Sequence, residues 1–194
     1  MRKFKILSKS KYIFHNFSIV PLRSKDCYSI MQMRNEQMYH LRQSTLLTEE
    51  AQDQYFKNVV SDLFNKEKPD QLLFSFLKSG EFIGYGGLVH INWMDKYAEI
   101  SFIMKTELEE GNFECFWINY LSLIEKVAFE ELGFHKLFTY AFDVRPHLYK
   151  ILEKAGFKEE ARLKKHHLFG KEYVDVLIHS KFNRDDTIQE GIFK

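Results

Sequence analysis

The chain has 194 residues, of which 45% are hydrophobic and 28% are charged, and its formal net charge is +1. This length and balance suit one globular domain with a sizeable core. The near-neutral charge gives no overall electrostatic case for a nucleic-acid-binding protein. Its two cysteines make no disulfide framework and no apolar run is long enough to cross a membrane, so we expect a cytoplasmic protein.

The first 25 residues are basic, with seven Lys or Arg and no acid. Their short apolar stretch, 12–14, is followed at once by polar residues, so it fails as the core of a signal peptide. We therefore expect a basic, partly disordered N-terminal extension over 1–16. It would precede one domain over 17–182 and a C-terminal tail over 183–194.

The first half of the domain predicts one strand, two helices and then three strands. Thr48 is the expected N-cap of the second helix. Gly84, Gly86 and Gly87 fall inside one predicted strand, where they indicate a bulge or a close approach of two backbones. The expected elements are strands at 17–22, 72–78, 82–91 and 97–104 and helices at 25–39 and 48–63.

In the second half of the domain, the spacing of the apolar residues changes from a strand pattern to a helical one. Apolar residues from Phe113 to Leu132 recur at helical spacing, and Gly133 is a credible residue to end that helix. A strand at 136–142, a short helix at 146–155 and a hairpin of 158–168 with 173–181 are expected to follow. A strand, a helix and a strand in succession after residue 97 imply a parallel crossover, hence a mixed sheet of the α+β class.

Four short segments, in this order and spacing, contain family-like motifs. They are FIGYGGL at 82–88, YAEISF at 97–102, AFEELGFHKL at 128–137 and LEKAGF at 152–157 followed by EARL at 160–163. Together they resemble the GNAT superfamily, and locally its Rim-type branch of ribosomal-protein and amino-sugar acetyltransferases. The resemblance spans about 17–182. It implies a central mixed, mostly antiparallel sheet with two splayed parallel strands, flanked by helices.

The resemblance also implies where acetyl-CoA would bind. The pantetheine arm would add to the free strand edge at 101–104, which includes Phe102, Ile103 and Met104. The pyrophosphate would lie on the N-terminus of the following helix. The cofactor-binding residues expected there are Gly111, Asn112, Phe113 and Glu114.

The pyrophosphate loop departs from the family pattern. The family loop reads Gln/Arg-x-x-Gly-x-Gly/Ala, and the matching positions 108–113 keep only Gly111. Several glutamates surround the place where the phosphates would lie, and acidic groups there repel phosphate. The alternative is that they form a solvated face of the loop. The glutamates are Glu107, Glu109, Glu110 and Glu114.

Arg145 stands where the family often has an asparagine. It could contact a phosphate or the amide groups of CoA and so replace part of the lost loop charge. The alternative is a surface arginine paired with Asp143 or Glu153.

Acetylation of an amine needs a base, a donor for the developing oxyanion and an acid for the departing thiolate. Glu99 matches a family glutamate and is the expected base, with a structural ion pair to Lys96, His90 or another basic neighbour as the alternative. In the family, a tyrosine often serves as the general acid, and Tyr149 lies one helical turn before that position, so it is the candidate acid. The alternative is an exposed tyrosine packed beside the helix. Cys115 has no partnering base and is expected to be structural.

The two N-terminal helices and their linker are expected to select the acceptor. Arg34 and Arg42 could bind an anionic acceptor such as a nucleotide-linked sugar, whereas Glu36 could favour a cationic one. His90 could reach the same cleft, although a hydrogen-bonded sheet histidine is the commoner case. The histidines of the terminal hairpin have no metal-binding spacing, so no metal is expected.

These features predict an N-acetyltransferase that moves an acetyl group from acetyl-CoA to a primary amine of a small molecule, an amino sugar or a protein terminus. A catalytically inactive GNAT-fold binding or regulatory module is the alternative. The expected partner is a small-molecule or peptide amine, with no nucleic acid and no membrane span. A homodimer is left open.

Overall fold

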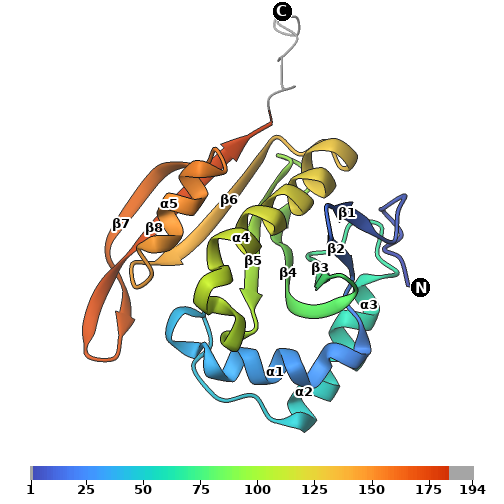
Figure 1. Cartoon of the computed structure of the whole chain (residues 1–194), viewed down its shortest axis with the longest axis horizontal. Helices are drawn as coiled ribbons and strands as arrows, with labels where there is room; N and C mark the ends of the chain where they lie inside the picture. The colour runs from blue at the N-terminus through green and yellow to red at the C-terminus, as the bar shows by residue number, and fades with distance from the viewer. Residues whose placement is uncertain (1, 184–194) are drawn as a thin grey trace, which may run out of the picture.

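The computed structural model describes residues 2–183, which form one eight-stranded sheet with helices packed against it (Figure 1). Residues 184–194 of the expected tail lie outside the described part. The strands are β1 Tyr12–Phe14, β2 Phe17–Pro21, β3 Leu72–Lys78, β4 Glu81–Asn92, β5 Tyr97–Met104, β6 Lys136–Phe142, β7 Lys158–Phe169 and β8 Glu172–Phe182. The helices are α1 Cys27–Glu36, α2 Glu49–Tyr55, α3 Ser61–Leu63, α4 Glu109–Glu125 and α5 His147–Lys154.

The sheet is mixed and mostly antiparallel, as predicted. Its strand order is β1-β2-β3-β4-β5-β6-β8-β7. Among the strands described within residues 2–183, only β5 and β6 run parallel, and α4 is the crossover between them. The chain returns through α5 to the β7–β8 hairpin, with β8 between β6 and β7. No helix within residues 2–183 is long and apolar enough to cross a membrane.

The two faces of the sheet pack against different helices. Phe102 of β5 stacks on Tyr120 of α4, with ring centroids 4.0 Å apart, and meets the edge of Trp117 at 4.9 Å. In Figure 1, α4 and α5 lie across this face of the sheet. Because side chains alternate along a strand, Ser101 points to the opposite face, which is covered by α1 and α2.

The N-terminal segment differs from the expected extension. Phe4 is 1% exposed and stacks on Phe64 at 4.6 Å, and Leu7 is also buried. Residues 12–14 form β1, which pairs with β2. The basic residues of this segment therefore surround aromatic and aliphatic side chains that complete the core, and the segment is part of the folded domain.

Two helices deviate from regular geometry. Thr48 caps α2 as expected, with the Ala51 N–H donating to its hydroxyl at 3.2 Å, but α2 continues into a π-helical turn at Phe56–Val60. The long helix α4 begins at Glu109, earlier than expected. Its first turn is broken at Glu110 and Gly111, and Gly111 has a φ of +74°.

The glycines of β4 allow close packing, which confirms the sequence prediction. A Cβ at Gly86 would overlap the Ser101 carbonyl oxygen and crowd the Tyr120 hydroxyl. A Cβ at Gly87 would overlap the Leu72 carbonyl oxygen. The strands on both sides of β4 therefore lie closer than any other residue would allow.

Candidate active site

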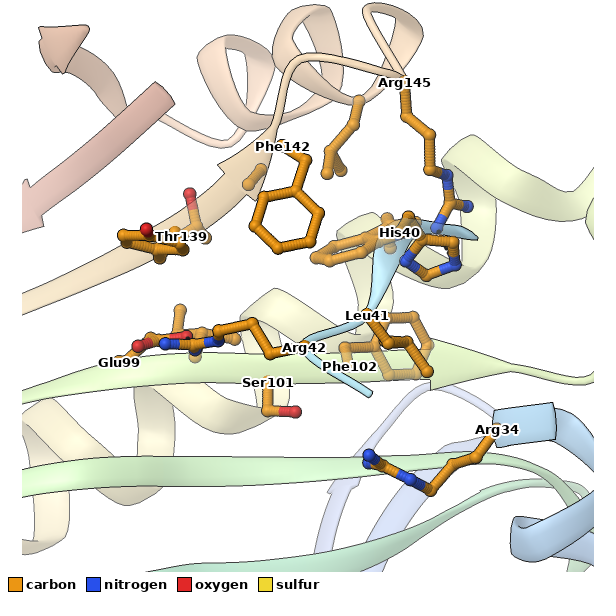
Figure 2. A pocket seen from close by; sticks show the side chains of 15 residues that line it. Arg34, His40, Leu41, Arg42, Glu99, Ser101, Phe102, Thr139, Phe142 and Arg145 are labelled. Carbon is orange, nitrogen blue, oxygen red and sulfur yellow. Dashed lines mark hydrogen bonds and ion pairs between the residues drawn. The ribbon is translucent and has the colours of Figure 1, made fainter. Parts of the chain in front are cut away.

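The splay of β5 from β6 creates a cleft. The two strands pair only where residues 97–99 meet 136–138. Beyond that point they diverge and leave a cavity of about 200 Å³ between Glu99, Phe102, Thr139 and Phe142. Figure 2 shows a segment of chain, residues 40–42, passing across this cleft between the two strands.

The backbone of β5 offers fewer free groups to the cleft than predicted. The carbonyl oxygens of Ser101 and Ile103 lie against Gly86 and Gly84 of β4. Backbone groups alternate in direction along a strand, so those of Phe102 and Met104 face the opening. The Met104 carbonyl already accepts a hydrogen bond from the side-chain amide of Gln37 at 2.7 Å. Phe102 therefore remains the best-placed backbone group, while Ile103 is turned away.

Glu99 contacts two other predicted site residues, Arg42 and His90. It is 5% exposed, and its two carboxylate oxygens contact different partners. Oε1 is ion-paired with Arg42, and Oε2 lies 2.8 Å from Nδ1 of His90. The Arg42 guanidinium also stands 4.7 Å from the Tyr140 ring of β6. The predicted pairing of Glu99 with His90 is present, and Arg42 is the further basic neighbour.

A bulge in β4 turns His90 toward Glu99. The β4–β5 register shifts between Val89 and Asn92, and His90 lies there with a φ of +48°. Such irregularities re-aim a side chain relative to the regular pleat. The His90 side chain is 63% exposed, whereas that of Glu99 is 6% exposed. The pair therefore connects a buried carboxylate to solvent.

Arg145 is buried in the upper wall of the cleft, with 7% exposure. Its guanidinium donates to Nε2 of His40 at 2.7 Å and to Glu109 at 2.8 Å, and it stands 4.7 Å from the Phe113 ring. Its Nε is buried and has no hydrogen-bond partner within residues 2–183. The alternative of a surface arginine paired with Asp143 or Glu153 is wrong, because the side chain turns inward toward α4.

His40 is held neutral beside Arg145. Burial, reinforced by the neighbouring guanidinium, lowers the pKa of His40 to about 3. Nε2 of His40 lies 2.7 Å from the Arg145 guanidinium, which can only donate, and 3.1 Å from Oε1 of Gln37. His40 thus connects the 40–42 segment to Arg145 without adding positive charge.

The predicted pyrophosphate residues lie next to the cleft, outside its lining. Gly111 has left-handed backbone geometry, and the Asn112 side chain donates to the Glu110 carbonyl at 3.3 Å. Glu114 is ion-paired with Lys154 at 2.6 Å, as Glu109 is with Arg145. Glu107 is also ion-paired, with Lys105 at 3.8 Å, so three of the four loop glutamates have a basic partner, which the solvated-face alternative did not anticipate.

Tyr149 does not reach the cleft. Its hydroxyl donates to Asp143 at 3.0 Å, and its ring stacks on His179 at 5.2 Å. Burial and the hydrogen bond to Asp143 raise the pKa of Tyr149 well above its ordinary value. The preceding residue of α5, Leu148, lines the cleft instead.

A second cavity, of about 400 Å³, lies between the sheet and helices α1 and α2. Arg34 and Ser101 line both cavities, so the two meet there. In Figure 2 the Ser101 hydroxyl and the Arg34 guanidinium lie on the same side of β5. Arg34 donates to the Tyr85 hydroxyl at 2.8 Å and to the Gln43 side chain at 2.9 Å.

Several cleft residues were missed by sequence reasoning. Thr139 and Tyr140 could have been found, because a parallel crossover places the residues after 138 beside those after 99. His40 lies in no motif of the sequence, and only the folded chain brings it to Arg145. Within residues 2–183, no three His, Cys, Asp or Glu side chains are grouped to hold a metal ion.

Known proteins resemble this chain both in sequence pattern and in fold. A model of the acetyltransferase (GNAT) domain matches residues 19–178. The structure of spermidine N-acetyltransferase from Vibrio cholerae in complex with CoA and spermine has a TM-score of 0.74 at 18% identity, over 88% of this chain and 97% of that one. A dodecameric structure of the V. cholerae enzyme in an intermediate state has a TM-score of 0.69 at 18% identity, over 92% and 100%. At this identity, the likeness to these structures is one of fold.

Proposed function

Because this chain belongs to the acetyltransferase (GNAT) domain family, whose members use acetyl-CoA, we propose that it acetylates a primary amine at the junction of its two cavities. The acceptor would be a small molecule, an amino sugar or a protein terminus. The observation that supports this most is the splay of β5 and β6 beside a buried carboxylate. The Rim-type branch suggested by the sequence motifs stays a prediction.

The cleft has features that suit acetyl-CoA, which supplies an activated acetyl thioester. The backbone of Phe102 would bind the pantetheine arm as an added strand. The N–H group at the buried Nε of Arg145 is available to donate a hydrogen bond to the cofactor. The guanidinium would exchange its ion pair with Glu109 for one with a phosphate. The first turn of α4 would add backbone N–H groups toward the pyrophosphate.

The segment crossing the cleft would have to withdraw for this binding. The present cavity of about 200 Å³ is smaller than the roughly 300–1,000 Å³ of sites that hold drug-sized ligands. Arg42 holds the segment to Glu99, and His40 holds it to Arg145. Withdrawal would free both Glu99 and Arg145 in one movement.

Glu99 would act as the base. An amine attacks a thioester only when it is deprotonated, so a nearby acceptor for its proton raises the rate. Once Arg42 leaves, Glu99 would take this proton, directly or through a water molecule. His90, which touches the carboxylate and is largely exposed, would pass the proton to solvent.

Calorimetric titration with acetyl-CoA, followed by an assay of CoA release with a panel of amines, tests the proposal. We expect saturable binding and release of CoA that depends on the amine. An inactive binding module would release no CoA with any amine. Absence of binding up to millimolar acetyl-CoA would contradict the proposal.

A further inference from the structure

The second cavity indicates which amines the protein accepts, on the premise of the proposed function. Its volume of about 400 Å³ falls in the range for small-ligand sites. Ile30, Leu73 and Val89 supply aliphatic walls, and Tyr55, Phe56 and Tyr85 supply aromatic ones. A ligand there would bury an apolar body rather than an extended polar chain.

Charge sets the second constraint. Among the described residues that line this cavity, Arg34 is the one charged side chain, and Asp and Glu are absent from the lining. A buried ammonium group without a carboxylate partner is strongly unfavourable. A polyamine would bring several such groups into a cavity whose single charge has the same sign. The cavity therefore disfavours the kind of acceptor named for the structurally similar spermidine N-acetyltransferase.

The position of Arg34 sets the third constraint. Arg34 and Ser101 lie where the two cavities meet, which is where the amine must reach the thioester. Two of the five guanidinium N–H groups are used by Gln43 and Tyr85, which hold the fork in place and leave donors for a ligand. A guanidinium fork recognises a carboxylate, so the acceptor's anionic group would lie beside its amine.

From these three constraints we infer that the acceptor is an α-amino acid with an apolar or aromatic side chain. Its carboxylate binds Arg34, its amine faces the cleft and its side chain fills the cavity between α1, α2 and the sheet. In the reaction, the bond from the acetyl carbon to sulfur breaks and a bond from that carbon to the amine nitrogen forms. The amine loses one proton, and CoA leaves as the thiol.

The test compares amino acids with amides of the same shape. L-phenylalanine is paired with L-phenylalaninamide, L-leucine is paired with L-leucinamide, and spermidine is the polyamine probe. CoA release and the mass of the acetylated product are measured at a fixed acetyl-CoA concentration. We expect kcat/KM for each amino acid to exceed that of its amide by at least about tenfold, the effect of a hydrogen-bonded charge. Spermidine should be the poorest acceptor.

Arg34→Gln isolates the carboxylate contact. The variant should lose the preference for amino acid over amide, mainly through a higher KM for the amino acid, with its acetyl-CoA affinity kept. The matched control is Arg2→Gln, at an exposed arginine that contacts Ser61 and does not line the cavity. The control should keep the wild-type preference.

The outcomes separate this inference from the proposed function. Equal or better turnover of the amides or of spermidine would overturn the inference and leave an active acetyltransferase. Acetyl-CoA binding without acetylation of either amino acid would also overturn it, while the cofactor part of the proposed function stands. A preference that survives Arg34→Gln would remove Arg34 from acceptor binding. Failure to bind acetyl-CoA would instead contradict the proposed function itself.

Discussion

The two cavities that meet at Ser101 differ in how they satisfy their polar groups. In the cleft between β5 and β6, Arg42 is paired with Glu99, and Arg145 contacts Glu109 and a neutral His40. In the cavity under α1 and α2, the walls are largely apolar and Arg34 is the one charged residue among the described lining. One strand, β5, contributes to both.

The difference implies two modes of binding. A ligand that binds in the cleft replaces existing ion pairs with ion pairs to itself. Its net binding free energy is therefore the difference between two similar interactions. A ligand in the second cavity removes apolar surface from water, at about 25 cal/mol per Å². The ion pairs of the cleft would therefore control when the 40–42 segment withdraws, and the shape of the second cavity would control which amine binds.

The largest expected effect comes from the carboxylate of the cleft. Glu99→Gln keeps the shape but removes the proton acceptor, so kcat should fall by about 10²–10⁴-fold. Acetyl-CoA affinity measured by calorimetry should not weaken, because the amide still fills the site and the ion pair that holds the 40–42 segment across the cleft is lost. Glu81→Gln, at an exposed glutamate that begins β4, is the control and should match the wild type. Wild-type turnover by Glu99→Gln would assign Glu99 to the alternative role of a structural ion pair.

The close packing of β4 against its neighbours should be the next most sensitive feature. Gly86→Ala places a methyl group against the Ser101 carbonyl and the Tyr120 hydroxyl. We expect a loss of about 3 kcal/mol in the free energy of unfolding, at the upper end of overpacking effects. Gly170→Ala, in the open β7–β8 turn, should lose only about 1 kcal/mol through its positive φ. Denaturant unfolding measures both, and equal losses would contradict the close approach at Gly86.

Arg145 and Glu109 test the exchange of partners in the cleft. Arg145→Gln should weaken acetyl-CoA binding by about tenfold or more, because a charged hydrogen bond to phosphate is lost. Glu109→Gln should instead strengthen acetyl-CoA binding, since it removes a carboxylate that competes with the phosphate for Arg145. Calorimetry on both variants is the measurement. Weaker binding in Glu109→Gln would show that the ion pair supports the site instead of competing with its ligand.

The smallest effect, counted per pH unit, is a pH dependence of stability from His40. Its pKa is about 3 in the folded protein and about 6.5 when unfolded, so on acidification the unfolded chain takes up the proton first. Stability should therefore fall as the pH drops from about 6.5 toward 3, by at most about 1.4 kcal/mol per pH unit. His40→Gln does not titrate and should flatten this part of the profile. Melting temperatures that change with pH in the same way in the wild type and in His40→Gln would contradict the role given to His40.

Much of the fold could be predicted because local patterns agree with it. The strands at 72–78, 97–104 and 136–142 have the predicted bounds, since turn residues and period changes mark both of their ends. β1 was missed because three residues are too few for a period-2 pattern to register. The burial of Phe4 and Leu7 was missed because the surrounding lysines suggested a solvated segment.

The site was less readable because it depends on long-range packing. The register of β5 brings Glu99 to the cleft, as the motif at 97–102 implied. The rotation of α5 directs Tyr149 to Asp143, and a spacing of one helical turn could not reveal that direction. The crossing of the cleft by His40 and Arg42 depends on contacts more than fifty residues away in sequence, for which no local pattern exists.

The glycine pair of β4 also bears on how such a protein can evolve. Gly86 and Gly87 allow β4 to pack closely against β5 and β3, and a side chain at either position would collide with backbone. Five residues that line the cavity under α1 and α2 come from these two helices, and their side chains can change without altering the strand pairing. Substrate range can therefore drift by substitutions in these two helices while the acetyl-transfer geometry is inherited unchanged. Families built this way should diversify in acceptor far faster than in fold.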